Sequence, residues 1–264
     1  MDEMQKYLFD LNGYLVIEDV LDPAGLAVLN GIIDGLEIPP DSLRVSYAGG
    51  RHTRPGFLDW GQPFVDLLDH PDVMPVLRFR LGDCFRLDRL YSIVMSPGQP
   101  MGKLHSDYGA SSPLAASVPG EYYSFPLNEV HSGFVVVSWN LTDSGPEHGG
   151  FCCLPGSHKS NYRLPRQIAE EGEDSPHVVI PEAPAGSVTF FTEALTHGTS
   201  AWRGPHQRRT LLFKYCVSQM AWGSGRVRPP DGCELTPRQR QLLAEPADPH
   251  RFFPSLFEEE ETTA

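Results

Sequence analysis

The 264-residue chain has little positive charge. Its 21 Lys and Arg residues are outnumbered by 34 Asp and Glu residues, which gives a net charge of −13 and a pI near 5.1. Non-specific binding to nucleic acids and docking on anionic membranes both require a basic surface. We therefore expect neither a nucleic acid nor a membrane as partner, and a small-molecule substrate instead. The sequence does not indicate the oligomeric state.

Long apolar runs and targeting signals are also lacking. No stretch approaches the roughly 20 apolar residues that a membrane-spanning helix needs, and Met1 to Lys6 has neither the basic region nor the apolar core of a signal peptide. The five cysteines are an odd number without the spacing of a disulfide framework. These absences predict a cytoplasmic protein with reduced thiols.

Signatures of two large enzyme classes are missing as well. The pairs Gly49-Gly50 and Gly149-Gly150 lack the spacing of a phosphate-binding loop. Ser157-His158 and Ser106-Asp107 are neighbours in sequence, but neither serine lies on a recognisable nucleophile elbow. The sequence therefore favours neither a nucleotide-binding protein nor a serine hydrolase.

What the chain does have is a turn-rich composition, with 25 prolines, 25 glycines and 40% hydrophobic residues. This favours many short strands in one domain over residues 1–264, with N-terminal helices within 1–80, a core barrel at 85–220 and a C-terminal extension at 221–264. Strands are expected at 14–17, 85–95, 133–141, 151–154, 177–180, 188–191 and 208–218. Helices are expected at 4–12, from Asp22-Pro23 onward, between 63 and 81, at 164–171 and at 236–245.

The strand at 85–95 has a side-chain pattern that can be read directly. With strict period-two alternation, one face would carry Phe85, Leu87, Arg89, Tyr91, Ile93 and Met95. The turn Ser96-Pro97-Gly98 follows, and the next strand would carry Lys103 to Asp107.

This next segment contains a His-x-Asp motif, His105 and Asp107, and a further histidine, His197, follows about ninety residues later. On a strand, residues two apart point to the same face. Two ligands on one face and a third from a distant strand form a 2-His-1-carboxylate triad, which leaves part of the coordination sphere of a metal such as Fe(II) open. Taken alone, a His-x-Asp can also be a hydrogen-bonded surface pair.

Four features in order strengthen the metal interpretation: His105-x-Asp107, Pro155-Gly156-Ser157-His158, His197-Gly198 and Arg208. Together they resemble the phytanoyl-CoA dioxygenase family of Fe(II)/2-oxoglutarate oxygenases, and the resemblance runs from Phe9-Asp10-Leu11-Asn12-Gly13-Tyr14 to the strand that holds Arg208. It implies a double-stranded β-helix, or jelly roll, with flanking helices. It also implies Fe(II), 2-oxoglutarate and O2 as cofactor and cosubstrates, with His105, Asp107 and His197 as metal ligands and catalytic residues.

The resemblance assigns further residues around the cosubstrate. Arg208 matches the position that binds the far carboxylate of 2-oxoglutarate, for which a planar guanidinium is suited. Its neighbour Arg209 points to the opposite strand face and is the fallback. Trp139 and Tyr91 resemble cosubstrate contacts more loosely, and plain core positions remain the alternative for both. By the same resemblance, His158 is a structural histidine.

The reaction implied is oxidation of a C–H bond with release of succinate and CO2. Asp107 favours hydroxylation or a related oxidation, because related halogenases have a small residue at that position; the sequence does not separate hydroxylation from desaturation or ring formation. We expect the substrate to be a small metabolite or natural-product intermediate. The acidic net charge disfavours a polyanionic CoA ester, but a local basic patch such as Arg51-His52-Thr53-Arg54 could override it, so a CoA ester stays open. Two alternatives stay open: a cupin-like zinc hydrolase or isomerase, which would have no use for Arg208, and a non-catalytic jelly-roll binding protein.

Two long loops would adjust the specificity of such an enzyme. Residues 109–131 directly follow the His-x-Asp motif and form a candidate lid. Residues 39–62 either line the mouth of the pocket or form a solvated loop, which we favour. The side chains considered for these roles are Tyr122, Tyr123 and Phe125 in the lid, and Arg44, Tyr47, Arg51, His52, Arg54 and Trp60 in the other loop.

Overall fold

The protein is described here from a computed structural model, which covers residues 1–36, 56–109, 133–222 and 227–257. Helix α1 (Glu3–Asn12) begins at an Asp2 capping box and ends at Gly13, whose φ of 79° is left-handed. Helix α2 (Pro23–Asp34) begins with the Asp22 carboxylate on the Gly25 amide and a proline in its first turn. The local signals in the sequence therefore place both helices correctly.

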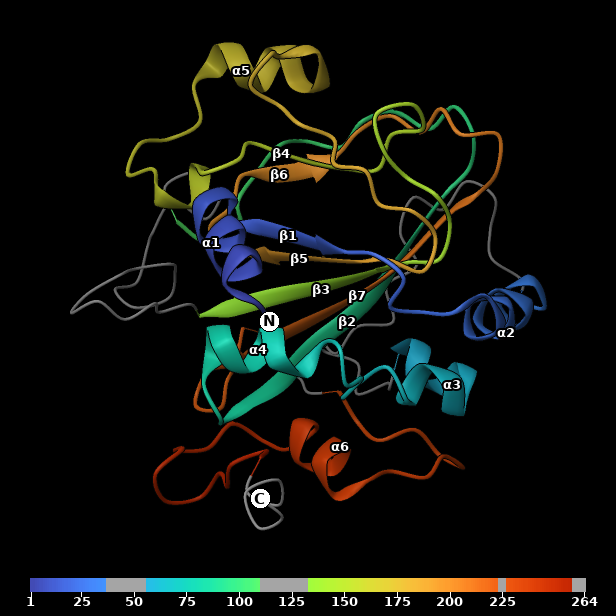
Figure 1. Ribbon diagram of the computed structural model, residues 1–264, viewed down its shortest axis with the longest axis vertical. Helices are drawn as coiled ribbons and strands as arrows, with labels where there is room; N and C mark the ends of the chain where they lie inside the picture. The colour runs from blue at the N-terminus through green and yellow to red at the C-terminus, as the bar shows by residue number, and fades with distance from the viewer. Residues whose placement is uncertain (37–55, 110–132, 223–226, 258–264) are drawn as a thin grey trace.

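Two antiparallel sheets form the centre of the fold. The larger sheet has the order β1-β5-β3-β7-β2, and the smaller pairs β4 with β6. The bounds are β1 (Tyr14–Ile17), β2 (Phe85–Met95), β3 (Phe134–Asn140), β4 (Phe151–Cys153), β5 (Val188–Thr192), β6 (His197–Thr199) and β7 (Arg208–Val217). Figure 1 shows the small sheet on one side of the large one and helices α3 and α4 on the other, the layering of a jelly roll.

The large sheet separates two apolar regions, and strand alternation decides which side chain enters which. On β3, Val135, Val137 and Trp139 join the core beneath the helices. Val136 of the same strand faces the small sheet instead, where it packs in a second cluster with Leu212 of β7. The second face is therefore the inside of the jelly roll.

Strand β2 departs from the strict alternation expected for it. Its pairing with β7 shifts between Leu87 and Arg89, so Asp88 forms a bulge. Phe85 and Leu87 pack on the helix side, whereas Tyr91 lies on the inner side with Ile93 and Met95. The prediction of a single face from Phe85 to Met95 is therefore wrong, because one extra residue exchanges the faces halfway along the strand.

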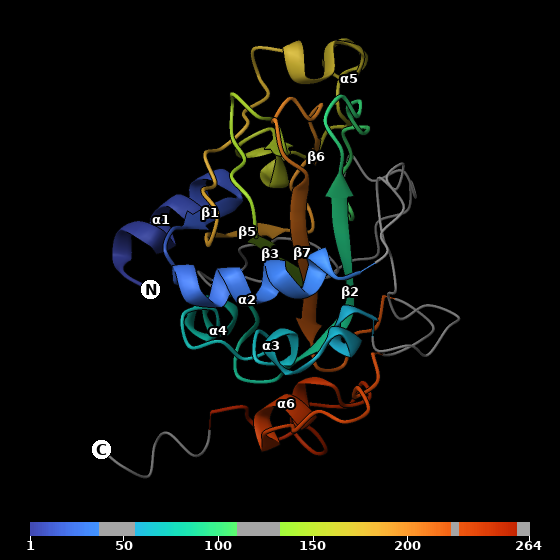
Figure 2. The same cartoon turned by 90° about the vertical axis from the view of Figure 1, so that its right-hand side faces the viewer.

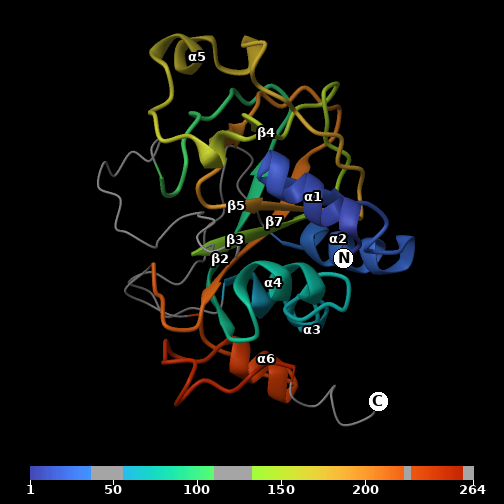
Figure 3. The same cartoon turned by 60° about the vertical axis from the view of Figure 1, so that its left-hand side comes forward.

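Short helices surround this framework. They are η1 (Gly56–Trp60), α3 (Gln62–Val65), α4 (Met74–Leu81), η3 (Ser157–Lys159), α5 (Arg166–Glu171), η4 (Gly172–Asp174) and α6 (Pro237–Leu242). Figure 2 shows α2, α3 and α4 close together near the lower end of the large sheet, and Figure 3 shows α6 beyond α4, away from the small sheet. Among the described residues, no helix has the length and apolarity to cross a membrane.

Other differences from the sequence predictions are local. The strand expected at 177–180 is reduced to one bridge between Val179 and Cys153. Helix α6 ends at Leu242 rather than at residue 245. Trp60 packs on Phe57 and Phe64 at ring separations of 5.8 and 5.3 Å, as part of the core boundary. The remaining side chains considered for the two loops, Arg44 to Arg54 and Tyr122 to Phe125, lie outside the described residues.

Candidate metal and cosubstrate site

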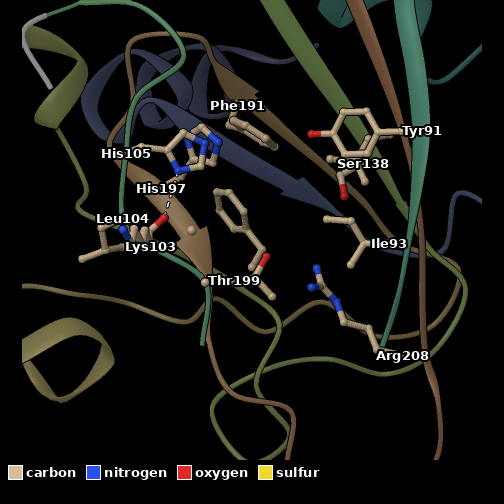
Figure 4. Close-up of a pocket in the computed structure, with 14 residues that line it drawn as sticks. Tyr91, Ile93, Lys103, Leu104, His105, Ser138, Phe191, His197, Thr199 and Arg208 are labelled. Carbon is tan, nitrogen blue, oxygen red and sulfur yellow. Dashed lines mark hydrogen bonds between the residues drawn. The ribbon is translucent and has the colours of Figure 1, made fainter. Parts of the chain in front are cut away.

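A cavity of about 420 Å³ lies between the two sheets. Its lining is mostly apolar, with a few polar groups that converge from several strands. Figure 4 shows the imidazoles of His105 and His197 on one side and the guanidinium of Arg208 on the other, with Tyr91 and Ser138 on the same side as Arg208 and above it in the view. The apolar part of the lining consists of Ile93, Leu104, Phe151, Phe191 and Leu212.

His105, Asp107 and His197 meet at the metal-binding end of this cavity. Each offers one ligand atom, and these three atoms all lie within 4.8 Å of one another. The Nε2 atom of His105 is 4.0 Å from Oδ1 of Asp107. The two histidines lie about ninety residues apart in sequence, and an antiparallel backbone bridge brings them together. In this bridge, each of His105 and His197 donates its amide to the other's carbonyl, at 2.9 and 2.8 Å. The donors fit one divalent cation with an open side.

The strand predicted for the His-x-Asp motif is shorter than expected. Only His105 makes a sheet bridge, and the chain bends at Asp107, after which the Tyr108 amide donates to the Glu193 carbonyl. Asp107 therefore reaches its neighbours from a bend, and simple strand alternation does not account for its direction.

Both histidines are oriented by backbone carbonyls. The Nδ1 atoms of His105 and His197 lie 2.9 and 2.8 Å from the carbonyl oxygens of Lys103 and Leu195. A proton on each Nδ1 would leave each Nε2 free as a ligand, the usual arrangement in metal sites. Burial lowers the pKa of His197 to about 4, so its imidazole is neutral at neutral pH, as a metal ligand requires.

Asp107 is held as a carboxylate by a residue that sequence reasoning missed. Burial by itself would raise its pKa, but the Lys214 ammonium, assisted by His197, lowers the pKa below its ordinary value. The Nζ atom of Lys214 lies 2.6 Å from Oδ2 of Asp107, and both side chains are buried. One signal was available in the sequence: Lys214 interrupts an apolar run and lies six residues after Arg208, on the same face of one strand.

Arg208 projects from β7 into the far end of the cavity and is 2% exposed. Its Nη1 lies 3.5 Å from the Met95 sulfur, and its buried Nε has no hydrogen-bond partner. Within the described part of the chain, no carboxylate pairs with this guanidinium. Burial lowers its pKa to about 10, which leaves it charged at neutral pH.

Arg209 faces the opposite way and has a structural role. Its Nη2 lies 2.6 Å from the Asp34 carboxylate, and its Nη1 donates to Asn30 on the same helix, α2. It thus ties β7 to α2 on the outer side of the sheet. Of the two neighbouring arginines, only Arg208 lines the cavity.

The remaining predicted site residues also differ in whether they line the cavity. Tyr91 lines the cavity, but Trp139 does not: its ring packs in the helix-side core against His70, at 5.3 Å between centroids. The β3 residue that faces the cavity is Ser138. The expectation for Trp139 is therefore wrong. His158 is buried away from the cavity, with Nε2 at 2.9 Å from the Asp10 carbonyl, so its position fits a structural histidine.

Comparison with known proteins bears on the family and the fold. The family model for phytanoyl-CoA dioxygenase matches residues 9–210. No curated protein sequence matches the chain. Among solved structures, HygX from Streptomyces hygroscopicus with nickel, 2-oxoglutarate and hygromycin B bound is 22% identical, with a TM-score of 0.69 over 84% of this chain and 89% of that one. HygX with iron bound is 21% identical, with a TM-score of 0.67 over 84% and 88%. The predicted jelly roll is confirmed.

Proposed function

The chain belongs to the phytanoyl-CoA dioxygenase family of non-haem Fe(II)- and 2-oxoglutarate-dependent dioxygenases, and we propose that it hydroxylates a C–H bond of a small metabolite or natural-product intermediate. Family membership favours a dioxygenase over the zinc hydrolase and the non-catalytic binding protein. We further propose that His105, Asp107 and His197 hold the iron, and that Arg208 binds the far carboxylate of 2-oxoglutarate.

One observation carries this assignment of residues. Arg208 is a buried cation with an unsatisfied Nε in a mostly apolar cavity, and no acidic partner lies near it in the described structure. Burying an unpaired charge is costly, so such a site is suited to an anionic ligand that arrives later. The triad at the other end of the same cavity supplies the second anchor that a chelating dicarboxylate needs.

The chain's residues would then have separate tasks. The neutral imidazoles of His105 and His197 and the carboxylate of Asp107 present three donors on one side of the iron. Arg208 orients the cosubstrate from the opposite end, while the apolar lining excludes water from the reacting centre. Iron, 2-oxoglutarate and O2 would supply the oxidising chemistry, with O2 as the oxidant of both the substrate and 2-oxoglutarate, which is released as succinate and CO2.

Three observations support the substrate class. A cavity of about 420 Å³ suits a small molecule. The net charge of −13 disfavours a polyanionic substrate. One structural relative, HygX, has hygromycin B bound. Asp107 keeps a carboxylate where halogenases have a small residue, which favours hydroxylation.

The test is an anaerobic titration of metal-free protein with Fe(II) and then with 2-oxoglutarate. A visible metal-to-ligand charge-transfer band is expected when the 2-oxo acid chelates Fe(II). Succinate release then identifies substrates from a panel of small metabolites and natural products. Iron binding without the band would contradict the assignment of the cosubstrate site, and failure to bind iron would contradict the assignment of the ligands.

A further inference from the structure

Lys214 is a charged residue in the middle of a buried strand. It lies on β7 among Leu211 to Tyr215 and is 4% exposed. Two aromatic rings enclose its ammonium group, with Nζ 4.1 Å from the Trp222 ring centre and 5.6 Å from that of Tyr91. An apolar side chain would pack here without the cost of desolvating a cation. The charge therefore needs an explanation beyond packing.

The two oxygens of the Asp107 carboxylate have different neighbours. Lys214 lies 2.6 Å from Oδ2, whereas Oδ1 is the atom 4.0 Å from Nε2 of His105. Two donor atoms at that separation can bind one metal ion. A carboxylate can also bind a metal through both oxygens. In this structure, the second oxygen is already engaged by a compact ammonium group.

From this geometry, and on the basis of the function proposed above, we propose that Lys214 is a positioning residue that keeps Asp107 monodentate on the iron. An octahedral metal with three protein ligands has three further positions. A 2-oxo acid chelates through two of them, and oxygen needs the third. If both oxygens of Asp107 bound the iron, they would occupy one of the three positions. Two positions would remain for the 2-oxo acid and none for oxygen. By holding Oδ2, Lys214 keeps the third position open for oxygen.

The shape of the lysine is part of the inference. An ammonium is a point charge that can satisfy one carboxylate oxygen, whereas a guanidinium has a planar fork that engages both. Lys214→Met should therefore free Oδ2 for the metal, and Lys214→Arg should draw both oxygens away from it. The two substitutions should change the number of Asp107 oxygens on the metal in opposite directions, and loss of packing alone would not produce this.

The experiment compares Fe(II) affinity with the affinity of the Fe(II)–2-oxoglutarate complex for nitric oxide, which binds Fe(II) at the position that oxygen needs, under anaerobic conditions. Lys214→Met should keep near-normal Fe(II) affinity but weaken nitric oxide binding about 10- to 100-fold, the range by which changes around metal ligands alter metal affinity or activity. Lys214→Arg should weaken Fe(II) binding instead. A crystal structure of Lys214→Met with Mn(II) should show both oxygens of Asp107 on the metal. Thermal melts identify any variant that does not fold, and either variant alone still tests the direction of the change.

Arg89→Met is the matched control. Arg89 lies opposite Lys214 on β2, and its guanidinium lies 4.3 Å from the same Trp222 ring centre, but its carboxylate partner is Asp88. Removing it should leave the Fe(II) and nitric oxide affinities unchanged. The inference is overturned if the Fe(II)–2-oxoglutarate complex of Lys214→Met binds nitric oxide like wild type, or if both Lys214 variants lose Fe(II) and nitric oxide binding equally. A wild-type protein without the charge-transfer band would instead refute the proposed function.

Discussion

Replacing Arg208 with methionine should weaken cosubstrate binding and, at the same time, leave the metal-free protein at least as stable as wild type. Most substitutions of a buried residue reduce stability. The opposite is expected here because the guanidinium is buried without an anionic partner in the described structure, and its Nε makes no hydrogen bond. Methionine fills similar space and carries no charge to desolvate.

The pKa of Arg208 gives the size of the stability effect. Burial lowers this pKa from 12.5 to about 10. The unfolded chain therefore binds the proton more tightly than the folded one, and below pH 10 the folded state carries the full penalty. At 1.36 kcal/mol per pKa unit, the penalty is about 3 kcal/mol. Arg208→Met should recover part of it, which urea unfolding of metal-free protein at pH 7 can measure.

The cosubstrate effect should be larger and of opposite sign. Removing one partner of a buried ion pair costs about 3–5 kcal/mol, which corresponds to a rise in Kd of roughly 100-fold to several thousandfold. Fe(II) binding should be unchanged, because Arg208 lies at the far end of the cavity. The charge-transfer band, followed during an anaerobic 2-oxoglutarate titration, measures this Kd.

Arg209→Met is the control for this prediction. It removes an arginine from the adjacent position and breaks the contact with Asp34 on α2. It should lower stability by about 1 kcal/mol or less, because that ion pair is partly exposed, and should leave 2-oxoglutarate affinity intact. If Arg208→Met kept wild-type cosubstrate affinity while Arg209→Met lost it, the assignment of the cavity-facing arginine would be refuted.

Three further predictions test the site and its framework. His105→Ala should reduce Fe(II) binding below detection in the same titration, and retained binding would exclude His105 as a ligand. Burial raises the pKa of Glu193 to about 7, so wild type should lose up to about 3 kcal/mol of stability as the pH rises from 4.5 through 7. Glu193→Gln should flatten this decline, which urea unfolding at pH 5 and pH 8 measures. An unchanged decline would show that another group causes it. Gly13→Ala should destabilise the fold by more than about 2 kcal/mol, because φ is +79° and a Cβ would collide with the His158 ring. Gly156→Ala is the matched control, because Gly156 is also left-handed, with φ at +77°, and the nearest atom to its Cβ is the Leu11 carbonyl oxygen at an ordinary 3.5 Å. Equal melting temperatures of the two variants would contradict the role of the collision.

The parts of the fold that follow from local chemistry could be predicted from the sequence. Asp22-Pro23 starts a helix and Asn12-Gly13 ends one, because caps depend on residues within one turn. The three ligand candidates were also identifiable, since their residue types and order carry the signal. Each of these inferences uses residues close in sequence or a motif whose order is preserved.

The incorrect predictions concern features that depend on pairing between strands distant in sequence. The bulge at Asp88 depends on how β2 pairs with β7, and it exchanges the faces of the strand. A loose resemblance to cosubstrate contacts points to Trp139, but strand parity places it in the helix-side core, the alternative left open for it, and gives the cavity Ser138. Lys214 was missed because its partner, Asp107, is distant in sequence and comes from a bend.

The paired arginines on β7 have a consequence for how this protein tolerates insertions and deletions. Arg208 and Lys214 share one face of the strand, so a slip of one residue would turn both outward. A slip in one direction would bring Arg209 into the cavity as a replacement cation and put Tyr215 where Lys214 had been. A slip in the other direction would bring in Gln207 and Phe213, so that both cations would be lost. We therefore expect length variants of this strand to lose control of the metal's coordination in both directions, and the cation at the far end in only one.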